Sequence, residues 1–94
     1  MYSMRTLTIV RRPGSIGKPR DVTIISDEKK LGELKAEQES VSIPFDGKEH
    51  AFQAQIVGRD GRIYRSNSYF ENSGVKELKL FLTVSGAKMV LSVN

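Results

Sequence analysis

The stretch that decides the fold is residues 39–66, which read ESVSIPFDGKEHAFQAQIVGRDGRIYRS. Three segments of strand-forming residues are separated by two Asp-Gly pairs, Asp46-Gly47 and Asp60-Gly61. Asp-Gly between alternating hydrophobic residues is a strong short-range signal for a β-hairpin, because the central residues of the tight turn need positive φ. This stretch therefore predicts a three-stranded antiparallel meander.

The same alternation continues on both sides of this stretch. Residues 4–11, 21–26, 77–84 and 88–93 each place apolar side chains at every second position, as half-buried strands do. Strands at this short, even spacing predict an all-β fold in one domain, residues 1–94. We expect an immunoglobulin-like antiparallel β-sandwich of about seven strands, with a small OB- or SH3-like barrel as the alternative.

Residues 28–38 allow two interpretations. Glu, Lys, Leu and Ala are good helix formers, so a short helix is one of them. Gly32 in the middle of the segment and the scarcity of large apolar residues weaken that helix. The sequence favours a polar turn over 27–30 followed by a short strand over 30–35.

The composition limits the class of protein. The 94 residues include no cysteine, which excludes disulfides, thiolate nucleophiles and cysteine-ligated zinc. No apolar run approaches the roughly 18–20 residues of a membrane span. Residues 1–10 lack the apolar core of a secretory signal. We therefore expect a cytoplasmic protein.

The net charge of +4 is concentrated near the N-terminus. Residues 1–20 contain no acid, whereas residues 21–94 are nearly neutral. Basic side chains beside a glycine-containing loop suit anions, so this segment is a candidate anion-binding site. Its residues would be Arg11, Arg12, Lys18 and Arg20. The simpler interpretation is a solvated basic loop, and we expect Arg5 and Arg11, at the strand ends, to reach water.

A second basic segment lies near aromatic residues. Single-stranded nucleic acid is bound where aromatic rings stack on bases beside cationic side chains. The candidate residues for such a surface are Arg59, Arg62, Tyr64 and Arg65, with Tyr69 and Phe70 following. Because no RNA-binding motif accompanies them and strand aromatics mostly pack cores, we disfavour nucleic acid here.

No catalytic, metal or cofactor signature is present in the sequence. His50 is the single histidine, and neither a metal site nor a catalytic triad can be assembled around it from spacing. A histidine at a strand end that bonds within its turn is the simpler interpretation. We expect no cofactor, no metal and no enzymatic activity.

Part of the chain resembles a known kind of domain. The resemblance rests on a strand, an acidic turn, a Gly-hydrophobic pair, a second strand and a turn ending in histidine, at Val22 to Ile25, Asp27, Gly32-Glu33-Leu34, residues 40–44 and residues 47–50. This pattern resembles small bacterial β-sandwich domains of the PEGA-like, immunoglobulin-like kind. The resemblance implies a non-enzymatic module of binding or architecture, and many such modules belong to the cell surface or envelope.

The sequence thus predicts a non-catalytic binding or structural-accessory module. It would act through sheet faces or edges on a protein partner or on itself. The apolar terminal segment 88–93 could pair with a second copy to form a homodimer. The alternative function is an anion or nucleic-acid binder that uses the basic N-terminal loop.

Overall fold

The computed structural model describes residues 5–12, 20–45, 51–58, 60–71, 75–85 and 88–93 of the 94-residue chain. Every regular element in these ranges is a β-strand. The nine strands are β1 (Arg5–Arg11), β2 (Val22–Ser26), β3 (Lys29–Leu34), β4 (Ser40–Phe45), β5 (Ala51–Val57), β6 (Ile63–Arg65), β7 (Tyr69–Phe70), β8 (Glu77–Ser85) and β9 (Lys88–Ser92).

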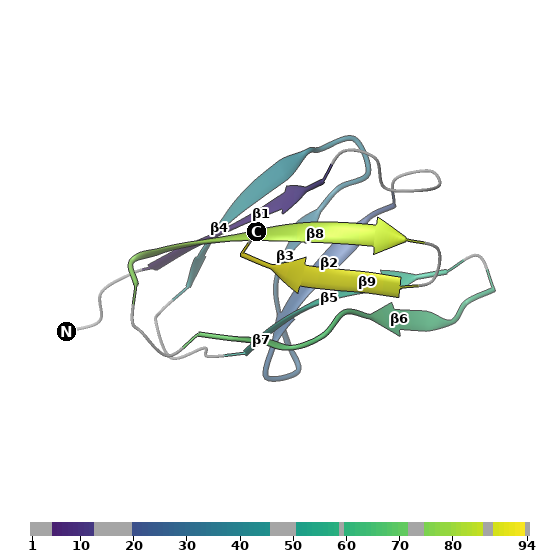
Figure 1. Ribbon diagram of the computed structural model, residues 1–94. Helices are drawn as coiled ribbons and strands as arrows, with labels where there is room; N and C mark the ends of the chain where they lie inside the picture. Colours follow the sequence, from purple (N-terminus) through teal and green to yellow (C-terminus); the bar gives the residue numbers. More distant parts are fainter. Residues whose placement is uncertain are drawn as a thin grey trace.

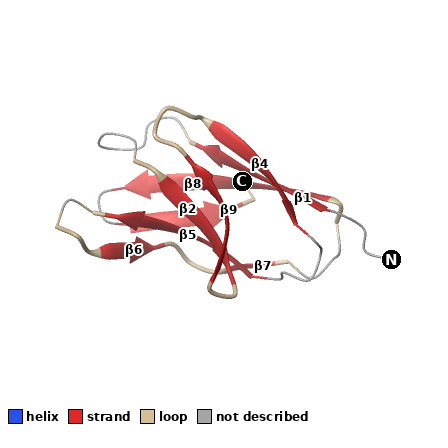
Figure 2. Cartoon of the chain, turned by 180° about the vertical axis from the view of Figure 1, so that it is seen from behind, coloured by secondary structure: helices blue, strands red, loops and turns tan. Residues whose placement is uncertain are grey.

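The strands form two sheets that pack face to face (Figure 1). We call the sheet with strand order β4-β1-β8-β9 sheet A. Sheet B has the order β3-β2-β5-β6, and its short strand β7 also pairs with β5 (Figure 2). Neither sheet closes on itself, so the predicted all-β sandwich is confirmed and the barrel alternative is wrong. There are nine described strands rather than about seven, partly because residues 63–70 divide into two short ones.

The sequence predicted a purely antiparallel sandwich, and this prediction is wrong for one pair of strands. β1 lies between β4 and β8, antiparallel to β4 and parallel to β8. These three strands are far apart in sequence, and β2 and β3 belong to the other sheet. Local turn signals report on neighbouring strands only, so they could not reveal this parallel pair.

The predicted meander over residues 39–66 is wrong in its first half. β4 pairs with β1 in sheet A, whereas β5 pairs with β2 and β6 in sheet B. The apolar faces of β4 and β5 meet across the core, and the rings of Phe45 and Phe52 form an edge-to-face pair with centroids 5.4 Å apart. Burying both faces favours opposite sheets over one hairpin. Asp46-Gly47 itself lies outside the described residues.

The second Asp-Gly pair does lie in a hairpin, which joins β5 to β6. Its Gly61 has a φ of 79°, and the Gly58 N–H donates to the Arg62 carbonyl at 2.7 Å. A second tight turn lies between β2 and β3. There Asp27 and Glu28 both adopt left-handed φ values, 50° and 66°, so a two-residue turn forms without glycine. β3 begins at Lys29, and the alternative helix over 28–38 is wrong.

The core lies between the sheets and is built by the alternation seen in the sequence. Leu7, Ile9 and Phe52 are among its fully or almost fully buried side chains. The sheets approach closely where Gly32 of β3 faces Ile43 of β4. A Cβ atom on Gly32 would lie 2.8 Å from Ile43 Cδ1 and 2.9 Å from Cγ1, so any other residue here would force the Ile43 side chain to move.

We predict that Gly32→Ala destabilises the fold by about 1–3 kcal/mol, because the added methyl overpacks the contact with Ile43. In an Ile43→Ala background the same substitution should become neutral or stabilising, since the clash is gone. Urea unfolding of the four proteins of this cycle measures the coupling. An equal cost of Gly32→Ala in both backgrounds would contradict the assigned contact.

Candidate functional site

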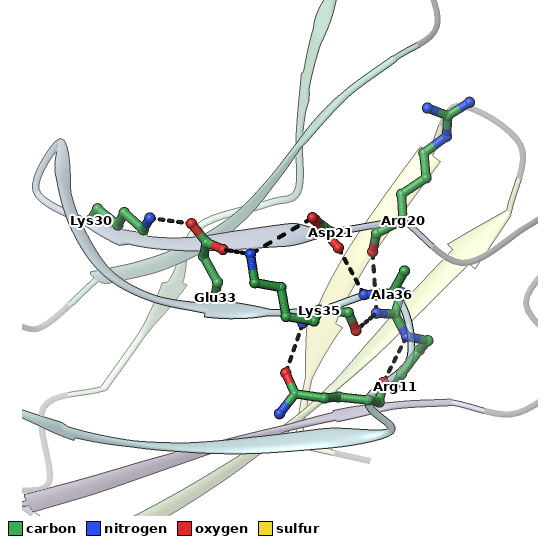
Figure 3. A network of polar contacts seen from close by, with 8 residues as sticks. Arg11, Arg20, Asp21, Lys30, Glu33, Lys35 and Ala36 are labelled. Atoms are coloured by element: carbon green, nitrogen blue, oxygen red, sulfur yellow. Dashed lines mark hydrogen bonds and ion pairs between the residues drawn. The ribbon is translucent and has the colours of Figure 1, made fainter.

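Arg11, a predicted anion-binding residue, is bonded within the fold. It ends β1, and its guanidinium donates to the carbonyl oxygens of Lys35 (3.0 Å), Arg20 (3.2 Å) and Gln38 (3.5 Å) (Figure 3). Burial lowers the pKa of Arg11, and Asp21 opposes that shift. The side chain therefore joins sheet A to the segments that flank β2 and β3, and it remains partly exposed.

An ion-pair network continues from Arg11 along β3. Glu33 pairs with Lys30 and, at 2.6 Å, with Lys35, which also lies 3.8 Å from Asp21 (Figure 3). Hydrogen bonds from Lys30 and Lys35 lower the pKa of Glu33 to about 2. The bond to Glu33 in turn raises the pKa of Lys35. These charges cover the outer strand of sheet B.

The side chains of Arg12 and Arg20, two other residues of the predicted anion site, do not join the Arg11 guanidinium. Arg12 lies on the opposite side of sheet A, where its Cζ is 4.8 Å from the centroid of the Phe81 ring. The side chain of Arg20 points away from the network in Figure 3, and its carbonyl accepts the bond from Arg11. Lys18 lies outside the described residues. The structure thus separates Arg11 from Arg12.

The second predicted surface is also divided. Arg62 pairs with Asp60 at 3.4 Å, and the Tyr64 hydroxyl donates to the same carboxylate at 3.3 Å. The Tyr64 ring packs against the core. Arg65 faces the outside of sheet B, where it bonds to Gln55 and to both carboxylate oxygens of Glu28. Arg59 lies outside the described residues.

Sequence reasoning missed a buried ion pair. Arg5 and Glu71 are 7% and 6% exposed, and Nη2 of the arginine contacts Oε2 of the carboxylate. Arg5 Nε also donates to the Val75 carbonyl at 2.6 Å, and its Cζ lies 4.7 Å from the centroid of the Phe45 ring. The available signal was parity, since Arg5 lies on the same face of β1 as the buried Leu7. The pair ties the start of β1 to the segment before β8.

We predict that Glu71→Gln destabilises the protein by about 3–5 kcal/mol, because it leaves the Arg5 guanidinium buried without its counter-ion. The double variant Arg5→Met, Glu71→Gln should recover part of this loss, since the buried charge is then absent. Chemical denaturation checks both values. A loss below about 1 kcal/mol for Glu71→Gln would show that the pair is solvated.

The outer edge of β9 is occupied by a side chain of sheet B. The amide of Asn67, between β6 and β7, accepts from the Leu91 N–H at 2.8 Å and donates to the Leu91 carbonyl at 3.1 Å. These two bonds are those that a neighbouring strand would make with Leu91. Asn67 therefore stands where the predicted homodimer through residues 88–93 would place the partner strand.

The three remaining edges also resist strand addition. The Arg11 N–H bonds to the Glu39 carbonyl (2.7 Å), so the odd-numbered residues of β4 turn their backbone groups toward β1. The backbone of Pro44 therefore faces the outer edge of β4, where proline offers no donor. The edge of β3 carries exposed lysines and a register shift opposite Ile24 and Ile25. β6 has only three residues. Charges, bulges and short length all protect sheet edges.

We predict that Asn67→Ala opens the edge of β9 and produces concentration-dependent self-association, because both Leu91 backbone groups lose their partner. The exposed neighbour Ser68→Ala is the matched control and should remain as the wild type. Light scattering coupled to size-exclusion chromatography measures the mass. An Asn67→Ala protein with the wild-type mass up to the highest soluble concentration would show that Asn67 does not guard this edge.

The outer faces of the two sheets differ in character. Among the residues that the structure describes, the most exposed large hydrophobic side chains are Phe70 (67%), Ile63 (59%) and Val57 (56%), and all three belong to the outer face of sheet B. Val57 and Ile63 are direct cross-strand neighbours. Sheet A instead presents hydroxyls and lysines outward, and its outward Phe81 is partly buried. Apolar exposure therefore distinguishes the outside of sheet B.

The described residues contain no group of three or more His, Asp or Glu side chains placed to hold a metal ion. His50 lies outside them. Within the same part of the chain, no helix has the length and apolar character needed to cross a bilayer.

No protein-family model matches this sequence, and no curated protein matches it. The resemblance to PEGA-like domains therefore stays a prediction.

Proposed function

We propose that this protein is a non-catalytic interaction module that binds another protein through the outer face of sheet B. The observation that carries the proposal is the position of Val57, Ile63 and Phe70, each more than half exposed on that one face. Large apolar side chains exposed on one face and flanked by polar residues are typical of interaction surfaces. The guarded edges favour a face over strand addition.

The composition of this face suits a separate partner better than a permanent dimer. Val57 and Ile63 lie at one end of β5, and Phe70 lies opposite Ala51 at the other. Six residues of strand separate the two ends by roughly 20 Å. Gln53, Gln55 and Arg65 lie between them. Apolar anchors separated by polar groups are typical of non-obligate interfaces, whereas obligate dimers bury a more continuous apolar surface.

We further propose that the protein is bacterial, is related to immunoglobulin-like domains and acts in the cytoplasm. The PEGA-like pattern supports the bacterial origin, and the sandwich architecture supports the relation to immunoglobulin-like domains. A module that binds a protein in this way needs neither cofactor nor metal.

The test is a comparison of three proteins immobilised at equal density and exposed to extract of the source cell. We predict that Ile63→Ser, Phe70→Ser loses partners which the wild type retains, while its melting temperature stays unchanged because both side chains are exposed. Val93→Ser is the matched control, since Val93 is 46% exposed after β9, and it should retain them. Quantitative mass spectrometry of the bound proteins gives the measurement.

Identical bound proteins for the double variant and the wild type would overturn the proposal. If the wild type self-associates in light scattering and the double variant does not, the partner of this face is a second copy of the chain and not a separate protein.

A further inference from the structure

The outer face of sheet A carries a basic stripe that the sequence did not reveal. Buried Leu78, Leu80 and Leu82 point into the core, so Lys79 and Phe81 point outward. Arg12 follows β1 on the same side, and its N–H donates to the Leu82 carbonyl at 2.9 Å. Lys88, the first residue of β9, is paired with Ser85 of β8 and lies on the same face by the same alternation. Lys79, Arg12 and Lys88 thus share one face across three neighbouring strands, and the register spreads them over roughly 20 Å along β8.

An aromatic ring joins two of these cations. Arg12 Cζ lies 4.8 Å from the centroid of the Phe81 ring, and Lys79 Nζ lies 5.4 Å from it. Both distances are within the range of cation–π attraction, which holds the two charges over the sheet before any ligand arrives. The Arg12 guanidinium and the Phe81 ring are planar groups of the kind on which nucleobases stack.

The surroundings of the stripe also suit an anion. Thr8 is level with Lys79 on one side and with Ser42 on the other, and their hydroxyl oxygens are 3.1 Å apart. Glu77, at one end, is the single acid among the outward-facing described residues of β1, β4, β8 and β9.

We propose that the outer face of sheet A binds single-stranded nucleic acid. Lys79, Arg12 and Lys88 contact successive phosphates, and a base stacks on the platform made by Arg12 and Phe81. Single-stranded nucleic acid fits better than an acidic peptide, because a peptide carboxylate would use the cations but not the planar groups. This function is independent of the protein-binding face, which lies on the other side of the sandwich.

The test is fluorescence anisotropy of a labelled mixed-sequence single-stranded DNA of about 15 nucleotides. Three phosphate contacts predict that affinity falls about 20-fold between 50 and 200 mM salt. Arg12→Gln, Lys79→Gln, Lys88→Gln should abolish binding. Lys29→Gln, Lys30→Gln, Arg62→Gln removes equal charge from the sheet B side and should retain it. Phe81→Leu should weaken binding at least about fivefold without changing the salt dependence.

Three results would overturn the proposal. The first is no binding at 50 mM salt. The second is an equal loss in both triple variants, which would mean that net charge alone attracts the oligonucleotide. The third is a combined result, in which poly-glutamate competes as effectively as unlabelled oligonucleotide and Phe81→Leu binds with unchanged affinity. This result would indicate a general contact with polyanions. Circular dichroism melting of each variant confirms that the folded protein is compared.

Discussion

A sandwich of two open sheets has four outer strands, and each outer strand presents backbone donors and acceptors that must be satisfied without recruiting another chain. This constraint shapes the protein more than any single core contact does. Asn67 bonds both backbone groups of Leu91 on β9. Pro44 interrupts β4, lysines and a register shift cover β3, and β6 is short. Asn67 thus closes one edge, and proline, lysines, a register shift and short length protect the others, where a barrel would pair strands.

The same side chains connect the two sheets. Asn67 belongs to sheet B and bonds to sheet A, while Arg11 belongs to sheet A and bonds to the segments flanking β2 and β3. Gly32 allows Ile43 to approach. With the inner faces buried and the edges protected, the outer faces remain for function. One is apolar in patches and the other is basic, so the two proposed ligands would meet opposite sides of the molecule.

Alternation of apolar residues was sufficient to predict the strands and most of the core. Leu7, Ile9 and the face of Phe52 are buried as expected because strand parity is a local property. The pairing partners of the strands were harder to predict. Whether two consecutive strands form a hairpin or lie in opposite sheets depends on where their apolar faces meet in the core. That is why the meander failed at Asp46-Gly47, while the hairpin at Asp60-Gly61 is present.

The polar contacts were the least predictable part. Arg5 and Arg11 were expected to reach water because they end a strand. Arg5 is instead buried against Glu71, whereas Arg11 stays partly exposed and bonds to three carbonyls of other segments. The basic stripe could not be predicted from the sequence for a related reason. Arg12 and Phe81 become neighbours only through the parallel pairing of β1 with β8, and no local pattern announces a parallel pair.

Amide hydrogen exchange measured residue by residue tests the central claim that the Asn67 side chain closes the outer edge of β9. Leu91 lies on the outermost strand of sheet A, yet its N–H is bonded to Asn67. Ser42 lies on the opposite outer strand, with its backbone turned to the outer edge by the same alternation as that of Pro44. The account predicts that the Leu91 amide exchanges orders of magnitude more slowly than that of Ser42. Equally fast exchange at the two positions would contradict it.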